Sequence, residues 1–527
     1  FYSAGDLYYY CSGYSWVTGN RLKRLTIIMT YALLFSVFVI ASCGLVYELV
    51  AAALASYLVG DSVTQFSTII GTYLFAMGIG SYLSSYLGKG LIHRFILIEL
   101  CIGLIGGFTA AVLFLSFSFL GSLSVLLYTL IFIIGVLVGL EIPLLLRILK
   151  EQIQFKDLVA QVLTFDYLGA LIVSILFPVI LAPKLGLIRT GFFFGLMNVL
   201  VAGWTIWLFR ERLPGMVHLR NACIMTTGLL LAGFVYAGRM TDLAEENLFA
   251  DEIIFASSSP YQRIVLTRWK DDIRLHLNNH LQFSSRDEYR YHEALVHPGL
   301  SAVPYPRRVL VLGGGDGLAI REVLKYDTVE AITLVDLDEQ ITQLFSTNPM
   351  LTALNQNALG SPKVTIVNDD AFIWLEQNQE MFDFVVVDFP DPSNYSLGKL
   401  YTTAFYKLLR KHVSEQGIMA IQSTSSYFAP RSFWCIAATL ESVGFQVNAY
   451  HTYVPSFGDW GFVIASQRPY QPPESYPDHL KYLTPEIAKG MFHFPEDMQP
   501  VDGLEVNRLS NQILTRYFEE EWRQVVR

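Results

Sequence analysis

Two aspartates, Asp388 and Asp391, follow a predicted strand at residues 384–387. In open α/β sheets, ligands bind in the crevice outside the carboxyl ends of the strands. Two carboxylates at such an edge suit a cationic amine, because one can orient the amine and accept its proton while the other holds it. The pair therefore indicates chemistry on an amine. The alternative explanation is an Asp-Pro turn that closes the strand.

A glycine-rich turn, Gly313–Gly317, connects a predicted strand at residues 308–312 to a helix. Glycine permits a tight turn and lets the backbone come close to a ligand. Asp336 ends a second predicted strand about twenty residues later, where a carboxylate can bind two ribose hydroxyls. Asp370 follows a third strand, at a place where an adenine amino group could be recognised. The turn lacks the GxGxxG spacing typical of dinucleotide sites, so an adenosyl ligand is favoured over NAD.

Further motifs occur in order between about residues 250 and 465. They are Tyr261-Gln262, Leu277–Gln282, Asp287–Glu293 with His297-Pro298, Gly313–Gly317, Arg321-Glu322, Asp388–Pro392, Leu400-Tyr401, Phe405-Tyr406 and Trp460–Phe462. In combination they resemble the spermidine synthase family of polyamine aminopropyltransferases. The hydrophobic N-terminal half resembles the multi-span domain that is fused to some bacterial members.

The resemblance implies a role for each matched residue. Asp388 would be the general base for transfer of an aminopropyl group to an amine, with methylthioadenosine as the leaving group. The residues matched to the nucleoside site are Gln262, His292, Gly313, Gly315, Asp316, Asp336 and Asp370. The residues matched to the acceptor site are Gln282, Tyr291, Asp391 and Trp460. The implied co-substrate is decarboxylated S-adenosylmethionine or S-adenosylmethionine itself, without a prosthetic group or metal, and the implied assembly is a homo-oligomer.

Three positions depart from the pattern of that family. Leu277 is followed by Asn278-Asn279 where Asp-Gly is usual, and Phe457 stands where a tyrosine usually helps to hold the acceptor. Asp336 stands where glutamate is common, which is a conservative change. The first two departures leave the acceptor open. Methyl transfer, intramolecular cleavage or cyclisation of S-adenosylmethionine, and a transporter or sensor regulated by polyamine or nucleoside remain alternatives.

Charge and cysteine content restrict the classes of ligand. Residues 1–239 hold 14 Lys/Arg and 9 Asp/Glu, whereas the remainder holds 23 and 37. An acidic C-terminal half argues against nucleic acid, which calls for a basic face, and suits a cationic substrate. None of the five cysteines forms a CxxC motif or a Cys/His cluster, so the sequence gives no support for a metal site.

The residues that could do chemistry follow a very apolar N-terminal half. Of the 527 residues, 53% are hydrophobic, more than is usual in a soluble enzyme. Seven apolar stretches approach the roughly 20 residues that a transmembrane helix needs. They lie at about 25–47, 63–87, 95–117, 119–146, 160–182, 190–209 and 221–238. A cleaved signal peptide would explain only the first stretch, so membrane lipid is an expected partner. The resemblance to bacterial members of the family implies a bacterial inner membrane as the location.

Orientation in the membrane raises a conflict. Basic residues cluster before the first span and in alternate loops, which places the N-terminus in the cytoplasm. Seven spans would then place the C-terminal half outside, whereas an adenosyl co-substrate is a cytosolic metabolite. Either the number of spans differs by one or the biology is unusual. Four acids, Glu48, Glu99, Glu141 and Asp166, lie in or near the spans, where they could serve transport or substrate entry, or form bonds within the bundle.

The predicted fold is an N-terminal all-α transmembrane bundle followed by a C-terminal α/β Rossmann-like nucleoside-binding domain with a small β-strand lead-in subdomain. The alternation of strands and helices after Pro306 is typical of a doubly wound sheet. The expected segments are an N-terminal segment at 1–24, the bundle at 25–240, the β subdomain at 245–300, the catalytic domain at 301–470 and a helical tail at 471–527.

Overall fold

The computed structural model describes residues 31–56, 62–116, 123–150, 155–211, 213, 215–249 and 251–525. The chain divides into two compact units, residues 1–250 and 251–527. Each unit has its own hydrophobic core.

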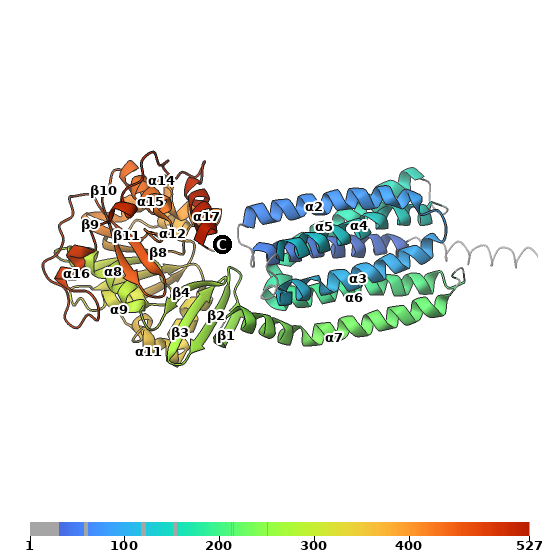
Figure 1. Cartoon of the computed structure of the whole chain (residues 1–527), viewed down its shortest axis with the longest axis horizontal. Helices are drawn as coiled ribbons and strands as arrows, with labels where there is room; N and C mark the ends of the chain where they lie inside the picture. Colours follow the sequence, from blue (N-terminus) through green and yellow to red (C-terminus); the bar gives the residue numbers. More distant parts are fainter. Residues whose placement is uncertain are drawn as a thin grey trace, which may run out of the picture. The chain divides into compact units, whose positions relative to one another are not determined.

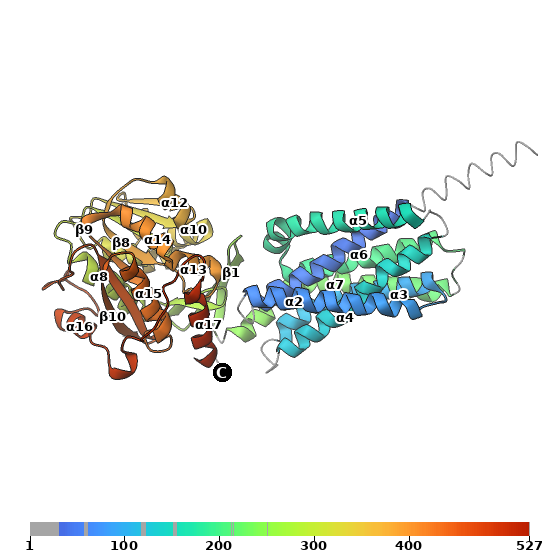
Figure 2. The same cartoon turned by 90° about the horizontal axis from the view of Figure 1, so that it is seen from above.

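The first unit is a bundle of apolar helices that run side by side (Figures 1 and 2). Within the described residues, seven helices are long and apolar enough to cross a membrane, which confirms the seven apolar stretches. Residues 25–30 of the first expected span lie outside the described residues. The helices are Tyr31–Ser56, α2 (Ser62–Leu83), α3 (Leu91–Ser116), α4 (Leu123–Leu149), α5 (Phe155–Leu176), α6 (Leu187–Leu208) and α7 (Met216–Leu248).

Glycines let neighbouring helices of the bundle approach closely. A Cβ added at Gly139 of α4 would lie 2.2 Å from the backbone oxygen of Met77 in α2. A Cβ added at Gly195 of α6 would lie 2.6 Å from the backbone oxygen of Gly103 in α3. Backbone contact of this kind is typical of helix packing in membranes. Large apolar side chains on the outer face, such as Val235 and Phe75, are mostly exposed, as lipid contact would require.

The second unit begins with a four-stranded antiparallel sheet. Its strands are β1 (Glu252–Ser258), β2 (Arg263–Trp269), β3 (Asp272–Leu277) and β4 (His280–Ser284). Strands at residues 252–255, 262–268 and 273–277 are predicted from the sequence, whereas β4 is not. The β3–β4 turn is Asn278-Asn279, with φ values of 48° and 69°. Asparagine tolerates this left-handed conformation, which two-residue hairpin turns need, so the unusual pair builds a tight hairpin.

A seven-stranded sheet forms the centre of the second unit. Its strands are β5 (Arg308–Gly313), β6 (Ala331–Asp336), β7 (Val364–Asn368), β8 (Phe382–Asp388), β9 (Val413–Gln422), β10 (Gln446–Val454) and β11 (Gly458–Ser466). The order is β10-β11-β9-β8-β5-β6-β7. Strands β5 to β9 are parallel, as predicted. The hairpin of β10 and β11 adds an antiparallel pair beside β9, so the sheet as a whole is mixed.

Side chains of the central strands alternate between two cores, one on each face of the sheet. In β5, Val309 and Val311 pack into one core with helix α8, whereas Leu310 and Leu312 pack into the other with helix α15. A strand buried on both faces reads as a continuous apolar run, which is the pattern that parallel sheets show. The helices of this unit are α8 (Glu288–Leu300), α9 (Leu318–Val323), α10 (Glu339–Thr347), α11 (Pro349–Leu354), α12 (Ala371–Gln377), α13 (Tyr395–Gly398), α14 (Thr403–Leu409), α15 (Pro430–Ser442), α16 (Pro485–Gly490) and α17 (Ile513–Val525).

The chain order in the sheet reverses between β5 and β8. Such a switch point is where open α/β sheets bind ligands. At the carboxyl end of this pair, Gly313 of β5 lies directly beside Asp388 of β8. Asp336 ends the neighbouring β6. The topology therefore brings the glycine turn and two of the predicted aspartates to one edge of the sheet.

The segment after β11 contains the short helices α16 and α17 and long irregular stretches. It packs closely on the sheet unit. The Glu521 carboxylate of α17 accepts hydrogen bonds from the amides of Arg431 and Ser432 at the start of α15. The Trp434 indole donates to the carbonyl of Met498. These contacts make the end of the described chain part of the same unit.

Candidate active site

The glycine turn is in close contact with the two strand-end aspartates. Gly313 has a φ of 76°, and a Cβ there would lie 2.3 Å from the backbone oxygen of Asp388. A Cβ at Gly315 would lie 2.7 Å from Oδ2 of Asp336. Neither position has room for a side chain. The glycines therefore allow the turn to pack against both carboxylate-bearing strands.

Asp336 is held by the backbone around it. Its Oδ2 accepts a hydrogen bond of 3.0 Å from the amide of Gly315, and its Oδ1 accepts one of 2.9 Å from the amide of Asp338. Burial raises the pKa of Asp336 to about 6, although both amides oppose that shift. The side chain of Gln262 donates to Oδ2 of Asp338 at 2.8 Å, so Gln262 lies beside this edge.

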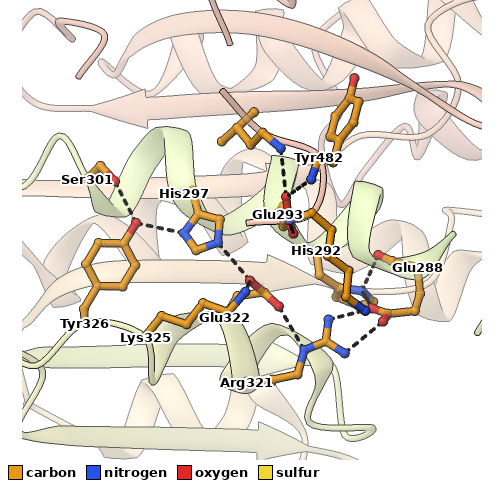
Figure 3. A network of polar contacts seen from close by, with 12 residues as sticks. Glu288, His292, Glu293, His297, Ser301, Arg321, Glu322, Lys325, Tyr326 and Tyr482 are labelled. Carbon is orange, nitrogen blue, oxygen red and sulfur yellow. Dashed lines mark hydrogen bonds and ion pairs between the residues drawn. The ribbon is translucent and has the colours of Figure 1, made fainter. Parts of the chain in front are cut away.

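His292 belongs to a buried polar network on one side of α8 (Figure 3). Its Nδ1 donates to the Glu288 carboxylate at 2.9 Å, and the same carboxylate accepts two bonds of 2.8 Å from the guanidinium of Arg321. Burial acts to lower the pKa of His292, but Glu288, together with Asp316 and Asp388, raises it to about 9. His292 is therefore a cation at neutral pH, located near the aspartates of the sheet edge.

The same helix is fixed by two further acids of the network (Figure 3). Glu322 accepts a hydrogen bond from His297 at 2.9 Å and also contacts Arg321. Glu293 accepts hydrogen bonds from the backbone amides of residues 481–483. Because buried polar groups are costly unless they are paired, this network fixes the position of α8 on the sheet.

Asp388 is bound by Tyr291 of α8, whose hydroxyl lies 2.6 Å from Oδ1. Burial raises the pKa of Asp388 to about 6, and Asp316 adds to that shift, whereas His292 and the Tyr291 hydroxyl oppose it. Burial and Asp388 together raise the pKa of Tyr291, so its hydroxyl stays protonated and remains the donor. A carboxylate with a pKa of about 6 is ionised at neutral pH and still basic enough to accept a proton.

Asp391 lies in a second buried group of side chains. Its Oδ1 accepts a hydrogen bond of 3.3 Å from the Gln422 amide, and the Oε1 of Gln422 accepts one of 3.3 Å from the Trp460 indole. The Gln422 amide also contacts the hydroxyl of Tyr401 at 2.9 Å. Burial raises the pKa of Asp391 to about 7, while Gln422 opposes the shift. The structure thus links two predicted acceptor residues, Asp391 and Trp460, through Gln422.

Aromatic rings lie between the side chains around Asp388 and the side chains around Asp391. The ring of Phe457 lies 5.0 Å from that of Trp460 and 6.3 Å from that of Tyr291, measured between centroids. Tyr291 also packs on Phe462 at 5.2 Å. Phe457, the residue that replaces the usual tyrosine, therefore lies between two of the predicted acceptor residues. It offers an apolar surface without a hydroxyl.

Three predicted residues have other described contacts. Asp316 accepts a hydrogen bond from the amide of Leu318, and burial raises its pKa. Asp370 accepts one from the amide of Phe372 and forms an ion pair of 2.6 Å with Lys399. Burial acts to raise the pKa of Asp370, but Lys399 holds it below the ordinary value.

Gln282 is the third of these residues. Its amide donates to the carbonyl of His280 in its own strand, and no described contact joins Gln282 to Asp388 or Asp391.

Several residues of the site carried no role in the sequence analysis. Glu288 and Gln422 are the links within the two buried groups, and Lys399 is the partner of Asp370. Glu288 lies inside the run Asp287–Glu293, so the sequence indicates its motif but not its function. Gln422 ends β9, the strand beside β8, and strand-end position was the signal that could have found it.

Comparison with known proteins agrees with the resemblance. A family model described as "Spermine/spermidine synthase domain" matches residues 288–474. A polyamine aminopropyltransferase of Leptospira interrogans is 55% identical over 94% of this chain and 100% of its own length. Polyamine aminopropyltransferase 2 of Ralstonia nicotianae is 56% identical over 94% of this chain and 99% of its own length.

A more distant relative is also similar over both halves of the chain. The polyamine aminopropyltransferase of Oceanobacillus iheyensis is 40% identical over 92% of this chain and 96% of its own length. Among solved structures, a spermidine synthase in complex with the transition state analogue AdoDATO is 25% identical, with a TM-score of 0.43. That similarity covers 46% of this chain and 86% of the solved one.

Proposed function

Because the chain belongs to the polyamine aminopropyltransferase family, we propose that Asp388 is the base for aminopropyl transfer in the second unit. The enzyme moves an aminopropyl group from decarboxylated S-adenosylmethionine to an amine acceptor such as putrescine. Methylthioadenosine is the second product. The observation that carries the assignment is the position of Asp388, which lies against the glycine turn on one side and Tyr291 on the other.

The nucleoside would occupy the sheet edge formed by Gly313, Gly315, Asp316 and Asp336. Asp336 would bind the ribose hydroxyls, because its carboxylate ends β6 beside the glycine turn. The remaining nucleoside contacts are proposed for Asp370, near the adenine amino group, and for Gln262, near the aminopropyl arm. Lys399, paired with Asp370, fixes the position of that carboxylate.

The acceptor would lie along the aromatic and acidic side of the site. Tyr291 and Trp460 would hold its methylene chain, Asp391 would bind a distal ammonium group, and Gln282 would contact its far end. Both carboxyl groups are buried, and an ammonium group bound beside them would favour their ionised form. The apolar ring of Phe457 between Tyr291 and Trp460 suits an alkyl chain.

The reaction requires a neutral attacking nitrogen. Simple amines resemble lysine, with a pKa of about 10.4, so the acceptor arrives protonated. Asp388 accepts that proton, the nitrogen lone pair forms a bond to the aminopropyl carbon, and the carbon–sulfur bond breaks. The bonding electrons move to sulfur, which leaves as neutral methylthioadenosine, and the proton passes from Asp388 to solvent. Alignment of the two substrates supplies much of the rate enhancement.

The resemblance implies a place for His292 near the sulfonium and the aminopropyl arm of the nucleoside, but we propose a different role. Its imidazolium lies near Asp316 and Asp388 and lowers the pKa of Asp388. A cation is a poor neighbour for a sulfonium but a good one for a carboxylate base. We therefore assign to His292 the function of keeping Asp388 ionised at neutral pH.

Mass spectrometry of the products tests the function. Purified full-length protein is incubated with decarboxylated S-adenosylmethionine or S-adenosylmethionine and with a panel of amines. We expect methylthioadenosine together with an amine that has gained one aminopropyl group. Adenosylhomocysteine would indicate methyl transfer instead, and methylthioadenosine formed equally fast without any amine would indicate intramolecular cleavage.

We further propose a bacterial cell membrane location, with the catalytic unit on the cytosolic side and a homo-oligomeric assembly. The seven helices support membrane insertion, and the supply of nucleoside supports the cytosolic side. The distribution of basic residues favours the opposite side. Labelling of a cysteine introduced at the exposed Asp327 with an impermeant maleimide in intact cells decides between the two sides.

The proposed homo-oligomer has its own test. Light scattering of the purified protein measures the number of chains in the assembly.

A further inference from the structure

The helical unit contains a largely apolar cavity into which acidic residues are built. Four helices, Tyr31–Ser56, α2, α4 and α5, surround a space of about 140 Å³. Three carboxylic acids from three different helices line it: Glu48, Glu141 and Asp166. Acids are expensive within an apolar bundle and usually face a partner or a polar cavity.

One oxygen of these acids is buried without a hydrogen-bonding partner in the described structure. Glu141 is 1% exposed, and its Oε1 is buried without a partner among the described residues. Glu99 of α3 contacts the Glu141 side chain and is also fully buried. The Asn198 amide donates to Oε2 of Glu99 at 2.8 Å, but Oε1 of Glu99 has no described partner. Two buried carboxyl groups in contact cannot both be ionised unless a positive charge compensates them, and otherwise they retain protons.

The described residues around the cavity supply no such charge. None of the described lining residues is Lys, Arg or His. Arg147, the single basic residue in α4, donates to the backbone carbonyls of Pro143, Leu87 and Ser84 rather than to an acid. The compensating charge therefore has to come from a bound cation or from protons.

The arrangement of the acids fits an extended cation better than a compact one. Among the described residues, no group of three His, Cys, Asp or Glu side chains comes together in a way that could hold a metal ion. The acids are instead distributed over separate helices, and apolar side chains such as Leu45, Met77 and Ile142 line the same cavity. Separated carboxylates joined by an apolar wall match a molecule with ammonium groups at the ends of a methylene chain.

The size of the cavity agrees with a short diamine. A protein cavity of about 150 Å³ can hold benzene, and butane-1,4-diamine has the same number of non-hydrogen atoms as benzene. We propose that this cavity is a binding site for an alkylammonium cation of the diamine class, separate from the catalytic site of the second unit. The site would allow the helical unit to bind the kind of amine that the second unit uses.

Equilibrium dialysis of full-length protein with radiolabelled butane-1,4-diamine tests the proposal. The catalytic site is disabled by Asp388→Asn together with Asp391→Asn, so that remaining binding reports on the helical unit. We expect about one diamine per chain in this background. Adding Glu141→Gln, which keeps the side-chain shape and removes its charge, should weaken binding at least tenfold.

Matched variants of α5 serve as the control. Asp166 lines the cavity, whereas Asp157 is an exposed acid at the start of the same helix. Asp166→Asn should weaken diamine binding, and Asp157→Asn should leave it unchanged. Equal binding by both variants, or no binding at all in the disabled background, would overturn the proposal, and the second result would assign the compensating charge to protons.

The test is independent of the proposed catalytic function. Glu141→Gln and Asp166→Asn are also introduced singly into the otherwise unchanged chain, and aminopropyl transfer by each is measured. If a variant retains aminopropyl transfer, its chain is folded. Weaker diamine binding by that variant is then a specific effect on the cavity of the helical unit. If the unchanged protein makes no aminopropyl product, the catalytic assignment fails while the dialysis result still decides the cavity.

Discussion

The Tyr291 hydroxyl donates a hydrogen bond of 2.6 Å to Oδ1 of Asp388, and so joins helix α8 to the end of strand β8. The helix and the strand are distant in sequence, and the Asp388 carboxylate joins them. On the helix side, the next residue, His292, is a cation held by Glu288. The protonation of Asp388 consequently depends on how α8 is placed.

Tyr291→Phe should reduce activity most at low pH. The hydroxyl opposes the burial that raises the pKa of Asp388, so its loss should raise that pKa above about 6. A hydrogen bond to a charged group contributes about 1.5–3 kcal/mol, which corresponds to about tenfold or more in kcat/KM near pH 6. The measurement is kcat/KM against pH for both proteins. If kcat/KM of the two proteins falls at the same pH on the acid side, the Tyr291 hydroxyl has no influence on the pKa of Asp388.

Asp388→Asn should lower turnover by about 10²–10⁴-fold, as expected for loss of a general base. Nucleoside affinity should remain nearly the same, because the substitution keeps the shape of the side chain. In the wild type, activity should rise with pH through about 6 as Asp388 ionises. The variant should lose this step and recover partly at high pH, where more of the amine is neutral. Near-normal turnover of the variant at pH 7 would show that Asp388 is not the base and only closes a turn.

Asp336→Ala should weaken binding of the nucleoside. Each lost hydrogen bond from a ribose hydroxyl to the carboxylate would cost about 1.5–3 kcal/mol. Isothermal titration calorimetry with methylthioadenosine measures the affinity. Asp327→Ala, at an exposed acid beyond α9, is the matched control and should bind normally. Equal affinities of the two variants for methylthioadenosine would show that Asp336 does not bind the nucleoside.

Glu288→Gln should destabilise the second unit by about 3 kcal/mol, at the low end for breaking a buried ion pair, because Glu322 still contacts Arg321. It should also remove a pH dependence. The folded pKa of His292 is raised to about 9, so its contribution to stability is complete below about 6.5 and is lost as pH rises through about 9. Melting temperature between pH 6 and pH 9 should therefore fall more for the wild type than for the variant.

A fragment of residues 245–527 should fold without the helical unit. The second unit has its own two-sided core, and its length fits an independent domain. Methylthioadenosine should raise the melting temperature of the fragment, since a ligand that binds the folded state stabilises it. Expression as an unfolded aggregate with no ligand-dependent shift would show that the helices are needed for folding.

The strand-end residues could be predicted because their signals are local. Gly313, Asp336 and Asp388 each follow an apolar run that reads as a buried strand, and parallel strands bring their carboxyl ends to one edge. The seven helices could be predicted equally well, since an apolar stretch of this length can be seen in the sequence itself.

The polar links could not be predicted in the same way. Gln422 meets Asp391 across 31 positions of sequence, and Arg321 meets Glu288 across 33. Such pairs depend on how α8 packs against α9 and on where β9 joins the sheet, which periodicity does not specify. Strand β4 was missed because five residues after an Asn-Asn turn are too few to show a pattern.

The two amides that bind Asp336 fix its side chain before any nucleoside arrives. The Gly315 and Asp338 amides each use one lone pair, and an ionised carboxylate offers about four, so acceptor positions remain for two ribose hydroxyls. The rotamer is set during folding, and the conformational entropy of that side chain is already lost in the free enzyme. Preorganisation of this kind lets more of the interaction energy appear as affinity.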